Sequence, residues 1–526
     1  MDIELEKKKN IQNKHSKYID NYIKNDLFWG IGIENELYLE FENKIKVTKG
    51  FFTKNHKRER YSVNYFTSYK ENFKNESFNF SCTNDEIELP LILNSHSFLY
   101  TDSNNNSQKK YTKLCEPNEK FSGKTLGEEI INYNSFFKNT IDVNWLYDGD
   151  TIEFTTLKFY KVRLNDALNE LDSFKLKFID NLQEFQKKKN IFLDYGMIKI
   201  MEKNHPFSVH LTNLTNVAIF NNGTLHYNIT LPTQLNNKKF IKDKIKFFKD
   251  HKRAIKIIQW LEPFIICVYN TPDYFSTLEN YENKDMYSKC SQRCAVSRYI
   301  SIGTYDADLM LTGKILTISS DIFSNNDTWW YNKYHQESGY EKLNQIGLDI
   351  NFNKYYNHGI ELRFFDHITD SNLIFESFEF LIYLMDYILE NEIDIENPIY
   401  NNLWNNLVYN IMTSGKDYNL SCDEIFIYNK LLNLDIFSNN IKEVYYEIYF
   451  KLLFKYNNIV KKNDNDIFIE PIGLYSKLTL GKRNIDIKYF EKIQKYLTKI
   501  NIEETIIKKK SLCNRILNSL SCTKIN

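Results

Sequence analysis

Four short apolar segments of this chain carry residues whose chemistry suits a divalent cation and a phosphate group. The rest of the sequence is dominated by Asn, Lys, Ile, Tyr and Phe, so acidic, His and Arg residues inside apolar segments are the informative ones. Carboxylate oxygens bind Mg²⁺ and Mn²⁺, imidazole nitrogens can join them, and a guanidinium group pairs with two phosphate oxygens. The residues of these types are Glu34, Glu36, Glu153, His226, Glu361 and Arg363.

Each of these residues lies on a segment in which polar and apolar side chains alternate, which is typical of a β-strand. We expect strands at about residues 29–41, 151–156, 224–231 and 359–366. Because side chains alternate across a strand, one face of each segment is apolar and belongs to the core. The opposite faces carry the candidate residues, which are Glu34 and Glu36, then Glu153, then His226 and Asn228, and finally Glu361 and Arg363.

If these strands share one sheet, their carboxylates crowd together and repel each other once water is partly excluded. The crowding predicts a bound cation, and the oxygen ligands favour Mg²⁺ or Mn²⁺ over zinc. Residues two apart on a strand are roughly 6.5 to 7 Å apart, so Glu34 and Glu36 can hold different ions around one phosphate chain. We expect His226 to be a further ligand or phosphate contact, and Arg363 to neutralise a transferred phosphoryl group.

The hydrophobic pattern predicts an α+β fold, with an antiparallel (mixed) sheet that has a polar active-site face and helices packed on its other face. Apolar residues three to four apart predict helices at 164–182 and 242–269. The Asn221-Asn222-Gly223 turn signal predicts a β-hairpin that joins residues 217–220 to 224–231.

The chain divides into three regions by composition. We assign residues 1–41 and 141–369 to a catalytic core and the polar, aromatic-rich residues 42–140 to an insertion. Residues 370–526 are expected to form a mainly helical C-terminal region.

The bulk composition excludes several classes of protein. Lys and Arg number 68 and Asp and Glu also number 68, so there is no overall charge to attract nucleic acid or anionic lipid. No signal peptide and no apolar stretch of about twenty residues is present, and the eight cysteines include no C-x-x-C pair. We therefore expect a cytoplasmic protein with reduced thiols, small-molecule or peptide substrates, and neither nucleic-acid nor membrane partners.

Five motifs, in this order, resemble those of the glutamate–cysteine ligase family and the wider carboxylate–amine ligase (amidoligase) group. The family's G-x-E-x-E strand is matched by residues 32–36, and its D-x(n)-E-F-x-T segment by residues 145–156. Its H-Y-N strand is matched by residues 225–230, its S/T-x-R element by residues 291–293, and its E-x-R-x-x-D strand by residues 360–366. Each motif alone is weak, but the ordered set is fairly specific.

The resemblance implies a glutamine synthetase-like catalytic core that forms a γ-glutamyl-type amide bond through an acyl phosphate, as in glutathione biosynthesis. By this resemblance ATP and Mg²⁺ (or Mn²⁺) are required, and Arg363 and Glu36 are catalytic. The implied ligands and contacts are, for the metal, Glu34, Glu36, Glu153, His226 and Glu361; for ATP, Arg363, His226 and Asn228; and for the substrate, Arg293, Ser291 and Tyr227.

Other functions stay open at this point. The same fold could ligate a peptide or polyamine, with residues 42–140 shaping a wider acceptor groove. A structural protein that keeps the fold without activity is a second possibility, and a guanidino phosphotransferase is a more distant third. The sequence does not identify the amine acceptor, the carboxylate donor, the general base or the oligomeric state.

Overall fold

The fold is α+β, and its centre is a single antiparallel sheet. The structure is a computed structural model that describes residues 27–48, 86–93, 126–148, 151–190, 193–203, 208–210, 213–218, 223–272, 274–277, 288–291, 304–314, 349–353 and 357–499. The central sheet has six strands in the order β14-β15-β11-β1-β7-β6, and every neighbouring pair is antiparallel. These strands are β1 (Leu27–Leu37), β6 (Trp145–Asp148), β7 (Thr151–Thr155), β11 (Thr224–Gln234), β14 (Ile350–Phe352) and β15 (Ile360–Asp366).

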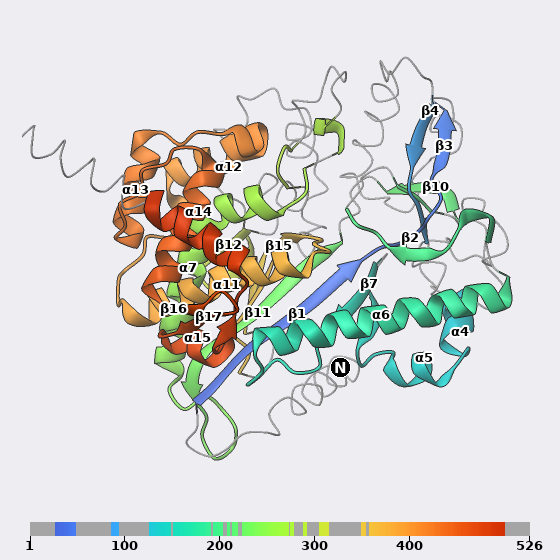
Figure 1. Ribbon diagram of the computed structural model, residues 1–526, viewed down its shortest axis with the longest axis horizontal. Helices are drawn as coiled ribbons and strands as arrows, with labels where there is room; N and C mark the ends of the chain where they lie inside the picture. The colour runs from blue at the N-terminus through green and yellow to red at the C-terminus, as the bar shows by residue number, and fades with distance from the viewer. Residues whose placement is uncertain are drawn as a thin grey trace, which may run out of the picture.

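The two longest strands, β1 and β11, form the middle of this sheet, side by side in Figure 1. Their apolar faces contain Ile31 and Ile33 on β1 and Leu225 and Ile229 on β11, all fully buried. This burial explains the register, because a slip of one residue would turn every apolar side chain to the other face. The alternation in the sequence therefore places the acidic residues correctly on one face.

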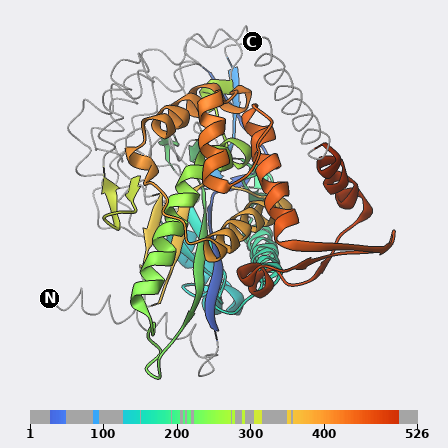
Figure 2. The same ribbon diagram turned by 90° about the vertical axis from the view of Figure 1, so that its left-hand side faces the viewer.

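Three long helices cover the apolar face, as expected from the sequence. Helix α6 packs on β1 and β7, α7 packs on β11 and β15, and α11 packs on both helices. Helix α7 also contacts the helices α12 and α14, which lie beside it in Figures 1 and 2. The bounds are α6 (Leu164–Lys189), α7 (Lys244–Tyr269), α11 (Ser371–Glu390), α12 (Asn402–Ser414), α13 (Cys422–Leu432), α14 (Ile441–Lys455) and α15 (Leu474–Thr479).

The C-terminal region is not only helical. It contains a three-stranded sheet formed by β16 (Asn457–Asn463), β17 (Asp466–Pro471) and β18 (Arg483–Asn484), which the sequence reading missed. This region is also joined directly to the central sheet, because the Tyr475 hydroxyl donates a 2.6 Å hydrogen bond to the Gly30 carbonyl.

A second sheet has five strands in the order β10-β9-β5-β2-β8. Strand β2 follows β1 after the single residue Tyr38, so one stretch of chain runs through both sheets. Strand β5, from the expected insertion, lies between β2 and β9, so this part of residues 42–140 pairs with core strands. The strands are β2 (Leu39–Phe41), β5 (Leu91–Leu93), β8 (Ile198–Ile200), β9 (Ser208–His210) and β10 (Asn213–Ala218).

The expected hairpin around Asn221 is wrong. Strand β10 pairs with β9 in the five-stranded sheet, whereas β11 pairs with β1 and β15 in the central sheet. From Thr224 onward, β11 is therefore already hydrogen-bonded to β1 on one side and to β15 on the other. No free edge of β11 remains for β10 to pair with. The turn residues 221 and 222 themselves lie outside the described residues.

Short elements complete the described chain. Two further pairs of strands are present, together with short helices in the loops. They are β3 (Ile45–Thr48) with β4 (Glu86–Leu89), β12 (Thr304–Asp306) with β13 (Leu311–Lys314), α4 (Leu126–Ile131), α5 (Ser135–Thr140), and the 3-10 turns η3 (Leu193–Tyr195), η4 (Tyr274–Thr277), η8 (Pro398–Tyr400) and η9 (Gly415–Asp417). Among the described helices, none combines the length and the apolar character that crossing a membrane requires.

Candidate metal and phosphate site

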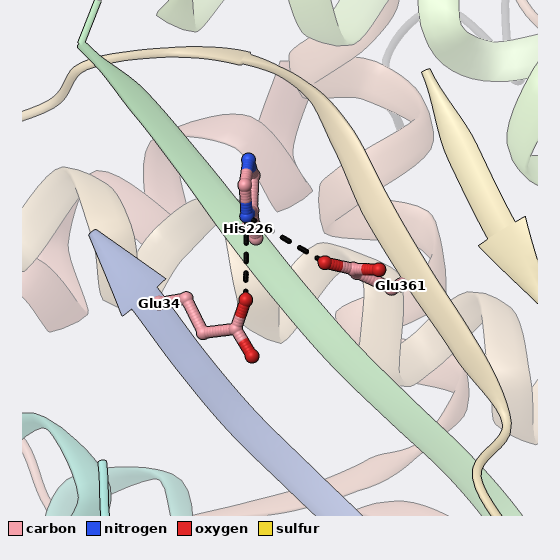
Figure 3. A group of neighbouring side chains, drawn as sticks. All are labelled: Glu34, His226 and Glu361. Carbon is pink, nitrogen blue, oxygen red and sulfur yellow. Dashed lines mark hydrogen bonds and ion pairs between the residues drawn. The ribbon is translucent and has the colours of Figure 1, made fainter. Parts of the chain in front are cut away.

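Glu34, His226 and Glu361 converge on the polar face of the central sheet, one from each of the adjacent strands β1, β11 and β15 (Figure 3). The His226 Nδ1 atom lies 3.4 Å from Glu34 Oε2 and 3.7 Å from Glu361 Oε1. The Cα register explains the convergence, since Glu34 lies opposite His226 on β11, and Glu361 lies opposite the next polar position, Asn228. Three segments remote in sequence thus form one acidic cluster.

The geometry of this cluster fits a small divalent cation. Ligand atoms about 2.1 Å from a Mg²⁺ ion are about 3 Å apart when adjacent and about 4.2 Å apart when opposite. One ligand atom from each of the three residues lies within 4.8 Å of the others, close to that range. Two carboxylates and one imidazole would leave the remaining positions of an octahedral ion to water or phosphate oxygens.

The hydrogen bonds around His226 indicate which ring nitrogen would be available to a cation. The Thr224 hydroxyl donates its proton to Glu36 Oε2, so it can only accept from the ring nitrogen Nε2 of His226, 2.9 Å away. The Nε2 atom therefore carries a proton, and in a neutral ring the lone pair of Nδ1 points at two carboxylates. A lone pair among anions is unfavourable unless a proton or a metal ion lies there, which suits a ligand site.

Glu36 and Glu153 extend the acidic face beyond this cluster. Glu36 Oε1 lies 3.6 Å from His226 Nε2. Glu153 on β7 lies directly opposite Glu36 in the register and accepts a 2.8 Å hydrogen bond from the Thr155 hydroxyl. The structure therefore brings Glu36 beside the three clustered residues but outside the group of three itself, and Glu153 lies one strand further, opposite Glu36. Their roles as metal ligands stay predictions.

Arg363 lies on the same face, two residues after Glu361 on β15 and beside a β-bulge. The pairing of β15 with β11 shifts between Leu225 and Tyr227, so two residues of β15 stand opposite His226. The guanidinium group lies 3.0 Å from Glu361 Oε1 and 4.0 Å from Glu36 Oε1. Burial disfavours its charge, but the carboxylates outweigh burial and hold the pKa of Arg363 above its ordinary value. A permanent positive charge therefore borders the acidic cluster.

Asn228 presents a buried donor on the same face. Its Oδ1 atom lies 2.7 Å from His358 Nε2, and its Nδ2 atom is buried and has no hydrogen-bond partner among the described residues. An unpaired buried amide group is costly, and a ligand oxygen would relieve that cost. The ATP contact expected of Asn228 stays a prediction.

Several residues around the site were missed by the sequence reading. His358 orients Asn228, Asn351 donates a 2.8 Å hydrogen bond to Glu361 Oε2, and Thr224 joins Glu36 to His226. The ring of Phe159 covers the polar face at Gly32, where a Cβ atom would lie only 1.9 Å from the ring. Thr224 and Asn351 sit at the register positions opposite Glu36 and Glu361, so only knowledge of strand pairing would have found them.

The three expected substrate-binding residues are not grouped at the cluster. Tyr227 lies on the opposite face of β11, where its fully buried hydroxyl donates to the Ile374 carbonyl on α11. Tyr227 alternates with His226 along the strand, so it is a core residue, and its expected contact with substrate is wrong. Ser291 is buried and donates a 3.2 Å hydrogen bond to Asp366 at the end of β15, and Arg293 lies outside the described residues.

The fold and site together define an α+β protein with a histidine-containing acidic cluster on one face of an antiparallel sheet. No family model matches the chain. The uncharacterized protein R704 of Acanthamoeba polyphaga mimivirus is 39% identical over 391 residues, which cover 73% of this chain and 66% of that protein, a little under two thirds of its length.

Among solved structures, a bifunctional glutathione synthetase from Pasteurella multocida is similar with a TM-score of 0.34 and 10% sequence identity. The match covers 82% of this chain and 48% of that protein. A likeness at this TM-score carries no argument about function.

Proposed function

We propose that this protein is an ATP-dependent carboxylate–amine ligase that uses a divalent cation. The observation that carries the proposal is the convergence of Glu34, His226 and Glu361, with Glu36 and Arg363 at their border. These residues belong to the motifs that resemble those of the glutamate–cysteine ligase family. That family is part of the glutamine synthetase-like superfamily. The motif resemblance supports the ligase activity, and the cluster geometry supports the divalent cation that this activity would use.

The roles of the chain's own residues follow from their positions. Glu34, His226 and Glu361 would hold Mg²⁺, which would neutralise their charges and those of the ATP phosphates. Arg363 lies at the border of the cluster, where its guanidinium group pairs with an oxygen of the transferred phosphoryl group. The Nδ2–H group of Asn228 donates to a further oxygen of the nucleotide.

The reaction that this arrangement supports is phosphoryl transfer followed by amide formation. A substrate carboxylate oxygen attacks the γ-phosphorus of ATP, the bond to the ADP oxygen breaks, and an acyl phosphate forms. An amine then attacks the acyl carbon, phosphate leaves, and the amine loses a proton. Positioning and charge neutralisation provide most of the acceleration in such transfers.

Trapping the acyl phosphate tests the proposal. The full-length protein is incubated with Mg²⁺, ATP, a panel of carboxylic amino acids and hydroxylamine, and hydroxamate and ADP are measured. We expect hydroxamate from at least one carboxylate, and its loss in Glu36→Ala. The matched control is Glu424→Ala, a carboxylate of similar burial that caps α13 in the helical region.

The outcomes separate the possible functions. Hydroxamate with a strict need for glutamate, and product only with cysteine, supports the glutamate–cysteine ligase type. Product with peptides or other amines instead supports an amidoligase with a different acceptor. A signal that Glu36→Ala does not change contradicts the proposed site, and absence of Mg²⁺-dependent ATP binding favours a non-catalytic structural protein.

A further inference from the structure

Asn35 is a buried polar residue directly behind the acidic face. It stands between Glu34 and Glu36 in sequence, so its side chain points to the opposite face of β1, among the apolar residues. Its exposed fraction is 0%. The alternation of β1 predicts an apolar residue at this position, and a buried amide is costly unless its donors and acceptor are paired.

Every polar group of Asn35 has a partner, and the partners come from separate parts of the chain. Its Oδ1 atom accepts a hydrogen bond from the ammonium group of Lys175 on α6. Its Nδ2 atom donates to the Thr224 carbonyl on β11 at 3.3 Å and lies 3.1 Å from His367 Nδ1, just after β15. One side chain on β1 therefore connects α6 with β11 and with the residue that directly follows β15.

The partners of Asn35 are themselves fixed. His367 Nε2 lies 3.0 Å from the Met201 carbonyl, which can only accept, so Nε2 carries the proton and Nδ1 accepts from Asn35. Burial and the nearby Lys175 lower the pKa of His367 to about 3, which keeps the ring neutral and preserves this arrangement. Burial lowers the pKa of Lys175 to about 8 against the attraction of Asp172, so the ammonium form still predominates at pH 7.

The network reaches the candidate ligands through Thr224. The carbonyl of Thr224 accepts from Asn35 on one side of the sheet, and its hydroxyl contacts Glu36 and His226 on the other side. The bond from Asn35 to Thr224 therefore holds β1 against β11 at the point where Glu36 and His226 meet.

We propose that Asn35, held by Lys175 and His367, is a positioning residue that fixes β1 and β11 so that the cation ligands converge. This inference rests on the proposed function, since it assumes that the acidic cluster binds a divalent cation. Asn35 itself touches neither the cation nor the substrate. Removing a group that orients metal ligands typically weakens metal binding by about 10- to 100-fold.

Two other roles for the network predict different results. If Asn35 only stabilises the fold, its loss lowers the melting temperature but leaves the cation affinity of the folded protein unchanged. If Lys175 acts only through its charge, its removal from behind an acidic site makes cation binding tighter. Positioning predicts weaker binding for both Asn35 and Lys175 variants.

The test measures Mn²⁺ affinity of the full chain by calorimetry and by the paramagnetic resonance signal of free Mn²⁺. The variants are Asn35→Leu, Asn35→Asp and Lys175→Met, with folding checked by circular dichroism and thermal unfolding without metal. The matched control is Asn405→Leu, because Asn405 is equally buried and donates to the Ile399 carbonyl at 3.1 Å, but in α12.

We expect at least a roughly 10-fold rise in the Mn²⁺ dissociation constant for each folded Asn35 variant and for Lys175→Met, and less than twofold for Asn405→Leu. Asn35→Asp keeps the size and an acceptor for Lys175 and loses the donor, so it serves if Asn35→Leu does not fold; its added negative charge favours cation binding, so weaker binding in this variant still reports the lost donor. Unchanged affinity in the folded variants, or tighter binding in Lys175→Met, overturns the inference while the proposed site stands. If the wild-type protein binds no Mn²⁺, the proposed function fails, and the inference falls with it.

Discussion

Lowering the pH from 7.5 to 5.0 is expected to weaken the folded state, because two buried histidines cannot bind a second proton in place. The Leu231 amide donates to Nε2 of His251 at 3.1 Å, and the Nδ1 atom of that ring lies 2.7 Å from the Phe247 carbonyl. In His367 the nitrogen that is free of a proton accepts from Asn35. Protonation of either ring would set a new N–H group against an existing donor.

The size of the effect follows from the pKa shifts. Burial lowers the pKa of His251 to about 4, and burial and Lys175 lower that of His367 to about 3, from an ordinary 6.5. Below pH 6.5 the unfolded chain binds both protons and the folded chain binds neither, so stability falls as the pH falls. Each histidine costs about 1.4 kcal/mol per pH unit, or about 2 kcal/mol at pH 5.0.

Asp386 acts in the opposite direction and reduces the net loss. Burial raises its pKa from 3.8 to about 6, against the hydrogen bonds that it accepts from Ser476 and Tyr475. A raised pKa gives stability that is lost as the pH rises through 6, so acidification from 7.5 to 5.0 restores about 1.4 kcal/mol. The net expected loss of unfolding free energy is about 2.5 kcal/mol.

Urea unfolding followed by tryptophan fluorescence at several pH values between 7.5 and 5.0 measures this loss. Calorimetry in buffers of different ionisation enthalpy counts the protons taken up on unfolding. His251→Gln and His367→Gln should each remove the uptake of about one proton near pH 5.5. A stability that is flat or rises toward pH 5.0, or a proton uptake unchanged in both variants, would refute the reasoning.

Three further substitutions test other parts of the structure. Glu361→Gln should abolish the stabilisation of the folded protein by Mn²⁺. In the wild type, Mn²⁺ at a hundredfold excess over its dissociation constant adds about 2.7 kcal/mol to the unfolding free energy. A Mn²⁺-induced rise in melting temperature equal to that of the wild type would contradict a role for Glu361 in cation binding. Tyr475→Phe removes the hydrogen bond to Gly30 and should cost about 1 kcal/mol in urea unfolding, and no change would mean that the bond contributes nothing. Gly32→Ala forces a methyl group against the Phe159 ring and should cost about 1–3 kcal/mol, with partial recovery when Phe159→Leu is added; additive effects in this double-mutant cycle would disprove the contact.

The polar face of the central sheet was predictable because alternation along a strand reports which side chains share a face. Glu34 and Glu36 on β1, and His226 and Asn228 on β11, lie on the polar face as expected. The long helices α6 and α7 also match their predicted positions closely, since their apolar residues recur at helical spacing over many turns. Local periodicity is sufficient for such elements.

Strand partners and bulges were not predictable because they depend on contacts remote in sequence. The turn signal before β11 favoured a hairpin, yet competition for the edges of β11 decided the pairing. The β-bulge beside Arg363 leaves no local signature. Tyr227 was assigned to the substrate because it lies inside a matched motif, although the alternation of the strand already placed it in the core.

The central cluster has a consequence for when the proposed cation site is complete during synthesis. The ring of His226 contacts a carboxylate 192 residues earlier in the chain, and the third residue of the cluster, Glu361, comes later still. A growing polypeptide on the ribosome thus has no complete cation site until strand β15 has emerged and paired. Any fragment that stops short of this strand, whether from interrupted translation or proteolysis, lacks the third ligand and should not retain the metal.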